Sequence, residues 1–219
     1  MRYRKVTHLS FFRNIEHLHS PKATNMYLAE PTTELEKEIR SVEQEISEGK
    51  KRLSKLRKKV KPRPVTDYTF EDKDGGTVKL SELFGDSKEL ILVSNMGKSC
   101  RYCTLWGDNY NGIVKPLNDR ASFVVASPDS PEVQREFAES RGWNFRMVSH
   151  QNNGWATETG VSHSEEINPA VASYIKDDAD QVYLVAVSCF GPGDNFCNMW
   201  DFIDLLPAGV NGWQPKYDY

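Results

Sequence analysis

Two cysteines separated by two residues follow an apolar run and begin a stretch of helical character, and this junction constrains the fold more than any other feature. The apolar run covers residues 89–94, and the motif is Cys100-Arg101-Tyr102-Cys103. Such a run is typical of a buried central strand. The sequence therefore predicts a strand-to-helix junction, where unpaired backbone N–H groups and the helix dipole favour a thiolate.

The order of the two cysteines predicts their roles. Cys100 lies nearer the helix end, where a thiol pKa is lowered by about one to several units from about 8.5, so it is the predicted nucleophile. Cys103 lies one turn further on and is predicted to resolve the mixed disulfide. Lys98 and Arg101 place positive charge nearby and are expected to stabilise the thiolate. Trp106 follows one turn later and is expected to shield the thiols or pack beneath them.

Strands alternate with helices along residues 65–219, which predicts a mainly parallel sheet covered by helices on both faces. The predicted elements are a hairpin at 68–80, a helical turn at 81–85, strands at 89–94 and 121–126 with a bent helix at 100–119 between them, a helix at 131–142, a strand at 145–149, a hairpin at 171–187 and a helix at 194–206. The late hairpin adds antiparallel strands, so the predicted fold is α/β with a mixed sheet.

The chain before residue 65 has a different character. Residues 1–25 are basic and show no sustained hydrophobic period, which predicts a flexible tail, with a transit peptide as the alternative. Between residues 33 and 60, apolar residues recur at alternating steps of four and three, which predicts a long amphipathic helix. The alternatives for this helix are a coiled coil that forms a homodimer and a helix that packs on its own domain.

Composition excludes several classes of protein. Residues 64–219 carry 23 Asp and Glu against 12 Lys and Arg, an acidic balance that argues against a nucleic-acid groove. The sequence has no apolar run near the ~20 residues that cross a bilayer and no apolar secretory signal at its start, so we expect an intracellular, cytoplasmic protein. Because intracellular thiols are mostly reduced, the close cysteine pair indicates redox or metal chemistry.

These features resemble the thioredoxin superfamily in its peroxiredoxin-like version, and more closely the DUF899 family of uncharacterised thioredoxin-like proteins. The resemblance covers about residues 35–215. The matching stretches are Val78-Lys79-Leu80-Ser81-Glu82-Leu83-Phe84, Cys100-x-x-Cys103-Thr104-Leu105-Trp106, Gly142-Trp143 and Asp204-Leu205-Leu206-Pro207. The resemblance implies a thioredoxin-like domain over residues 65–219 and no particular substrate.

The chain departs from better-known relatives at several positions. Peroxiredoxins carry a threonine three residues before the reactive cysteine and a proline three before that, whereas this chain has Gly97 and Ser94. Thioredoxin-like folds also place a cis-proline opposite the reactive cysteine. Pro169 occupies the matching position, where the resemblance implies a substrate-positioning role; an ordinary trans proline at a strand start is the alternative.

A second pair of cysteines, Cys189 and Cys197, leaves three alternatives open. The pair can complete a four-thiolate zinc site with Cys100 and Cys103, form a second redox pair, or serve as small apolar residues. Because a gap of seven residues is wider than the usual spacing of zinc ligands, the apolar interpretation is preferred and no metal is predicted.

The sequence therefore predicts a thiol–disulfide oxidoreductase that acts through Cys100 and Cys103 on protein or small-molecule disulfides, without a cofactor. One alternative is a peroxide-reducing enzyme, in which Cys100 becomes a sulfenic acid that Cys103 captures as a disulfide. The other is a non-catalytic binding or scaffold protein that joins its partners through residues 33–60. Nucleic acids and membranes are not predicted partners.

Overall fold

The computed structural model describes residues 30–161 and 168–219, so the predicted tail at residues 1–25 lies outside the described part of the chain. The chain divides into two units, one ending at Lys55 and the other running from Leu56 to Tyr219. Helix α2 spans Glu34–Arg57 and lies within the predicted helical range. The homodimer through residues 33–60 stays a prediction.

A capping box begins α2. The Glu36 backbone N–H donates to Thr33 Oγ1 at 3.1 Å, and the Thr33 N–H donates to the Glu36 carboxylate at 2.9 Å. These two hydrogen bonds satisfy backbone donors that the first helical turn leaves unpaired. The helix start therefore follows from local sequence alone.

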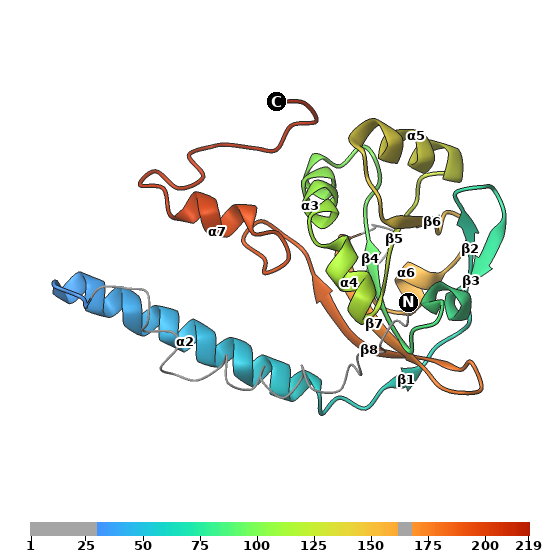
Figure 1. Cartoon of the computed structure of the whole chain (residues 1–219), viewed down its shortest axis with the longest axis horizontal. Coiled ribbons are helices and arrows are strands. Elements are labelled where there is room, and N and C mark those ends of the chain that lie inside the picture. Colours follow the sequence, from blue (N-terminus) through green and yellow to red (C-terminus); the bar gives the residue numbers. More distant parts are fainter. Residues whose placement is uncertain (1–29, 162–167) are drawn as a thin grey trace, which may run out of the picture. The chain divides into compact units, whose positions relative to one another are not determined.

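The strands form an eight-stranded mixed sheet with the order β1-β8-β7-β4-β5-β6-β2-β3 (Figure 1). The strands are β1 Arg63–Pro64, β2 Thr69–Asp72, β3 Thr77–Lys79, β4 Glu89–Ser94, β5 Ser122–Ser127, β6 Arg146–Ser149, β7 Ala170–Lys176 and β8 Val182–Cys189. Strands β4, β5 and β6 run parallel to one another, while the pairs at both sides of them are antiparallel. The predicted central mixed sheet is confirmed.

The helical elements of this domain are η2 Leu80–Phe84, α3 Arg101–Asn111, α4 Val114–Arg120, α5 Pro131–Arg141, α6 Trp155–Glu158 and α7 Met199–Asp204. The bent helix predicted between the first two central strands is the pair α3 and α4. Helix α5 starts at a Ser130 cap and ends at Gly142, whose φ of 64° is left-handed. In the described part of the chain, no helix is long and apolar enough to cross a bilayer.

Alternate side chains of the central strands enter two hydrophobic cores, one on each face of the sheet. Leu92 and Val124 belong to the core that contains Trp155 of α6. Val93 and Val125 belong to the other core, which contains residues of α3, α4 and α7. Because side chains alternate along a strand, one sheet carries helices on both faces, as predicted.

The C-terminal helix differs from its prediction, because α7 is shorter than residues 194–206. Asp194 does not cap this helix. Its carboxylate accepts hydrogen bonds from the backbone N–H groups of Gly191, Phe196 and Cys197 at 3.0, 2.7 and 3.2 Å. These bonds stabilise a turn instead, which is the local alternative that an aspartate offers the backbone.

Gly107 of α3 lies where packing leaves no room for a side chain. A Cβ atom at this position would lie 2.4 Å from Cζ2 of Trp143, whose indole N–H donates to Asp108 at 2.8 Å. Alanine gains about 1 kcal/mol of helix propensity over glycine, whereas overpacking costs about 1–3 kcal/mol. We therefore expect Gly107→Ala to lower the free energy of unfolding by about 1 kcal/mol in urea denaturation.

Gly112→Ala is the matched control for this substitution. Gly112 ends α3 in a right-handed helical conformation, and the nearest atom to its added Cβ is 3.7 Å away. This variant should be as stable as the wild type or more so. Equal stability of both variants would show that the Trp143 ring moves without cost.

Candidate active site

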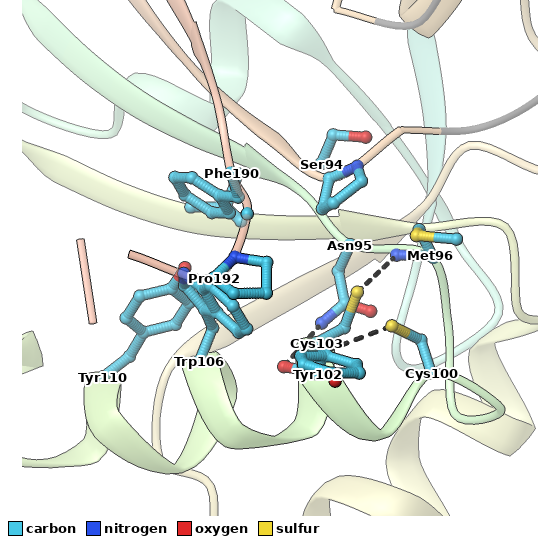
Figure 2. A pocket seen from close by; sticks show the side chains of 13 residues that line it. Ser94, Asn95, Met96, Cys100, Tyr102, Cys103, Trp106, Tyr110, Phe190 and Pro192 are labelled. Carbon is cyan, nitrogen blue, oxygen red and sulfur yellow. Dashed lines mark hydrogen bonds between the residues drawn. The ribbon is translucent and has the colours of Figure 1, made fainter. Parts of the chain in front are cut away.

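The two cysteines lie where β4 ends and α3 begins (Figure 2). Cys100 is the N-cap of α3, and its Sγ accepts a hydrogen bond from the Cys103 backbone N–H at 3.1 Å. Cys103 is buried in the first turn, and its Sγ accepts from the Met96 N–H at 3.4 Å. Both thiols are free. The predicted strand-to-helix junction is confirmed, with the first sulfur less buried than the second.

Hydrogen bonds separate the pKa values of the two thiols. A hydrogen bond from the Cys103 thiol, followed by those from the backbone N–H groups of Cys103 and Tyr102, lowers the pKa of Cys100 to about 6 against the effect of burial. The same thiol–thiol bond and burial raise the pKa of Cys103. At neutral pH the pair therefore holds one proton, with Cys100 as the thiolate and Cys103 as the thiol.

Lys98 and Arg101 are not among the groups that lower the pKa of Cys100. Both residues are exposed, and the Arg101 guanidinium donates to the Gln214 side-chain oxygen at 3.1 Å. The groups that lower the pKa of Cys100 are the thiol and the backbone N–H groups of its own helical turn. The thiolate-stabilising role of Lys98 and Arg101 stays a prediction.

Two residues that the sequence analysis did not single out shape the loop before Cys100. Asn95 Oδ1 accepts from the Gly97 N–H at 2.8 Å, and Asp129 accepts from the Lys98 N–H at 2.7 Å. Gly97 has a φ of 95°, and a Cβ there would lie 2.8 Å from the Asp129 carboxylate. The loop therefore requires glycine, and Asp129 fixes it from the loop after β5.

A cavity of about 270 Å³ lies beside the cysteine pair (Figure 2). Cys100, Cys103, Trp106 and Pro169 all line it. The structure thus brings together the residues predicted to be catalytic and those predicted to position a substrate. Lys98 and Arg101 do not line the cavity.

Trp106 and Pro169 are each fixed by a hydrogen bond at the cavity wall. The Trp106 indole N–H donates to Asp194 at 2.9 Å, and its ring stacks on Phe190 with centroids 6.2 Å apart. The Pro169 carbonyl accepts from the Phe190 N–H at 2.9 Å. Because no peptide bond within residues 30–161 and 168–219 is cis, Pro169 adopts the trans form that was the alternative to a cis-proline.

The second cysteine pair does not join the first. Cys189 is exposed at the end of β8, whereas Cys197 is fully buried in the core that contains Trp200. Burial raises the pKa of the Cys197 thiol. Among the residues that the structure describes, no three His, Cys, Asp or Glu side chains gather as a metal site, so the four-thiolate alternative has no structural support. Cys197 acts as a small apolar core residue.

Sequence comparison assigns the chain to a family. The profile described as "Bacterial protein of unknown function (DUF899)" matches residues 22–218, nearly the whole chain. The chain belongs to the DUF899 family. This confirms the resemblance drawn from the cysteine motif and the neighbouring stretches, while a search of curated proteins finds no match to this DUF899 protein.

Solved structures share the fold of this DUF899 protein. Peroxidoxin BcpB from Mycobacterium tuberculosis is 21% identical with a TM-score of 0.50, and the match covers 59% of this chain and 85% of that one. A mutant of PrxQ from Xylella fastidiosa is 12% identical with a TM-score of 0.51, over 63% of this chain and 90% of that one. The predicted thioredoxin-like, peroxiredoxin-like fold is thereby confirmed. At such identities the likeness concerns the fold alone.

Proposed function

We propose that this DUF899 protein is a thiol–disulfide oxidoreductase in which Cys100 attacks and Cys103 resolves. One observation carries the proposal: beside a cavity, Cys100, whose pKa is lowered to about 6, accepts a hydrogen bond from the buried Cys103 thiol, whose pKa is raised. Thiol–disulfide exchange requires a thiolate nucleophile and a second thiol within reach, and perturbed pKa values in a cleft are typical of such sites.

The exchange proceeds in two steps. The Cys100 thiolate forms a bond to one sulfur of a substrate disulfide, and the other sulfur leaves as a thiolate that takes up a proton. Cys103 then loses its proton and attacks Cys100 Sγ, which releases the second substrate thiol and leaves a Cys100–Cys103 disulfide. The substrate gains two electrons and two protons, and an external dithiol later returns the pair to its reduced state.

The hydrogen bond between the thiols links these steps. While Cys100 is a thiolate, its charge holds the proton on Cys103 and raises the pKa of that buried thiol. Once Cys100 is bonded to substrate, the negative charge is gone and Cys103 is easier to deprotonate. Formation of the mixed disulfide thus activates the residue that resolves it.

The test is the pH dependence of Cys100 alkylation by iodoacetamide, followed by mass spectrometry of the Cys100 peptide. Because its pKa is lowered to about 6, the rate should rise with pH, reach half its maximum near pH 6 and level off above neutrality. Cys103→Ala removes the thiol donor, so the midpoint should move toward about 8.5 and the rate at pH 7 should fall by about tenfold.

Cys189→Ala is the matched control, because Cys189 is a free, exposed cysteine outside the cavity. It should leave the Cys100 profile unchanged. A Cys103→Ala profile identical with that of the wild type would assign the thiolate to another stabilising group. A midpoint near 8.5 in the wild type would reject an activated nucleophile.

Peroxide reduction is the second candidate function, favoured by a fold shared with proteins named peroxidoxin and PrxQ. Here Cys100 would take the terminal oxygen of a hydroperoxide and become a sulfenic acid, releasing an alcohol or water. Cys103 would then attack the sulfenic acid sulfur, which forms the Cys100–Cys103 disulfide and releases the hydroxyl oxygen as water. Gly97 and Ser94 lack the threonine and proline that peroxiredoxins carry at these positions, so disulfide exchange is the preferred function.

A further inference from the structure

Helix α2 carries a continuous apolar stripe along one face. The stripe positions recur at alternating steps of four and three residues, the period of the seam between the helices of a coiled coil. Within the described part of the chain, no residue of α2 is buried. The apolar side chains of the stripe are 44–66% exposed, and they are Leu35, Ile39, Val42, Ile46, Leu53 and Leu56. Because helices in proteins are stabilised mostly by packing of an amphipathic face, this stripe indicates a partner helix.

Charged residues flank the stripe on both sides, and their sign changes along the helix. The flanking residues are acidic in the N-terminal half, at Glu36, Glu38, Glu43 and Glu45, and basic in the C-terminal half, at Lys50, Arg52 and Arg57. All of them are exposed. In a coiled coil, charges at these positions face the partner helix and set its identity and orientation. A helix with one acidic and one basic half is complementary to a second copy of itself that runs in the opposite direction.

The glycine within the stripe favours the same antiparallel arrangement. A Cβ atom added to Gly49 meets no atom within 4 Å, so no contact in the described chain requires glycine here. In a parallel pair, each stripe residue faces its own copy, and two Gly49 residues would leave a gap between the helices. In an antiparallel pair with Gly49 opposite Ile46, each layer holds at least one large side chain, and Val42 lies opposite Leu53.

Opposite charges meet in this antiparallel register. Glu43 lies beside Lys50 of the second copy, and Glu45 lies beside Arg52, because residues that flank facing layers are neighbours. The two-fold symmetry of the pair repeats each of these contacts. Such contacts stabilise the pair and weaken as salt is added.

A parallel pair would bring like charges together. Glu43 would lie beside Glu38 of the second copy, and Arg52 would lie beside Arg57, each contact again occurring twice. Like charges at such positions destabilise a helix pair, and only the contact in the middle of the helix would be attractive. The charges and the glycine therefore both select the antiparallel direction.

We propose that a second copy of this chain covers the stripe, so that two α2 helices form an antiparallel coiled coil. The occupant is a second copy because the charge pattern of α2 is complementary to itself, and the direction follows from the same pattern. This homodimer is independent of the proposed function, since no residue of α2 lines the cavity beside Cys100.

The oligomeric state of the full chain is measured by sedimentation equilibrium under reducing conditions, so that no disulfide joins two chains. We expect a reversible equilibrium between monomer and dimer. Val42→Asp places an unpaired carboxylate of each copy in the seam and should raise the dimer Kd at least about a hundredfold. Ser41→Asp is the matched control, because Ser41 adds the same charge on the outer face of α2. It should dimerise like the wild type.

Charge substitutions test the direction of the helices. Glu43→Lys and Arg52→Glu each turn an attraction into a repulsion at both symmetric positions, and each should raise the Kd about tenfold at low salt. In a parallel pair, the same substitutions would remove like-charge contacts and lower the Kd. Lys51→Glu is the control for Arg52→Glu, because it changes the net charge equally on the outer face of α2. Combining Glu43→Lys with Lys50→Glu exchanges the signs of one pair and should restore the wild-type Kd.

Several outcomes would overturn the assignment. A chain that stays monomeric at every concentration would show that a second copy does not cover the stripe. A Kd that Val42→Asp leaves unchanged, in a variant shown to be folded by circular dichroism, would place the dimer interface elsewhere. A lower Kd in Glu43→Lys and Arg52→Glu would reverse the direction of the helices. The proposed function is tested separately, because the monomeric variants keep the cysteine pair and its cavity.

Discussion

The Cys100→Ser variant is expected to lose thiol–disulfide exchange by a factor of about 10³ or more, the scale on which the loss of a nucleophile acts. A serine hydroxyl is not ionised at neutral pH, and no second thiol replaces Cys100 at the start of α3, because Cys103 is buried and its pKa is raised. The measurement is the release of thiopyridone from 4,4′-dithiodipyridine, a neutral aromatic disulfide, by the reduced protein in a single turnover. Both the Cys100→Ser chain and its reference carry Cys189→Ser, because the exposed Cys189 thiol also reacts with this reagent.

Two companion variants separate attack from resolution. Cys103→Ser should still attack but accumulate as a mixed disulfide, visible as the added mass of one thiopyridine group. Cys189→Ser, at an exposed cysteine outside the cavity, should react at Cys100 like the wild type. Release of thiopyridone at the wild-type rate by the Cys100→Ser protein would reject the mechanism. Rapid oxidation by hydrogen peroxide with slow disulfide exchange would favour the peroxidase alternative, and inertness toward both would favour the scaffold.

Truncating Trp155 to alanine is expected to lower the free energy of unfolding by about 3–5 kcal/mol. Trp155 is fully buried, and its ring packs edge-on against the Phe70 ring with centroids 5.6 Å apart. Its indole N–H donates to Tyr174 Oη at 2.9 Å. The variant therefore loses both the packing of a large ring and a buried hydrogen bond. Since domains are stable by only about 5–15 kcal/mol, this loss shifts the urea midpoint far to lower concentration.

Phe202→Ala is the control for this substitution, because Phe202 is an aromatic residue with 63% of its surface exposed. Its effect should stay within about 0.5 kcal/mol. Trp155 belongs to the core on the opposite face of the sheet from α3, so the Cys100 alkylation midpoint should not change in Trp155→Ala. A loss of less than about 1 kcal/mol would show that this core relaxes around the missing ring.

The sequence predicts most of the domain wherever local signals are strong. The predicted bounds of β4 match those in the structure because an apolar run defines this strand. The predicted bounds of α5 match because Ser130 and Gly142 cap this helix. Strand β1 was missed, because two residues show no period and its pairing partners, such as Leu184, lie far along the chain. Helix α7 was predicted too long, because Asp194 is a good N-cap in sequence but stabilises a turn in the structure.

In the candidate active site, too, local sequence predicts some features, and others depend on contacts between distant residues. The spacing of the cysteines and Trp106 on one helix places them together at the cavity, because helical neighbours share a face. The contribution of Asp129 could not be found this way, since it contacts a loop 31 residues earlier in the chain. The sequence also does not predict that the Ser94 and Tyr110 hydroxyls lack a hydrogen-bond partner among the described residues, because a missing hydrogen bond can be recognised only after every neighbouring residue has been placed.

The order of strands in the sheet has a consequence for synthesis of the protein on the ribosome. Strand β7 pairs with β4, and the cavity wall formed by Phe190 comes from the segment after β8. About 90 residues separate Cys100 from this wall, so at roughly 5–20 residues per second the nascent chain carries the cysteine pair without its cover for about 5–20 s. During that interval the thiols have neither the finished sheet nor the aromatic wall around them, so the pair is more open to oxidation in the nascent chain than in the folded protein.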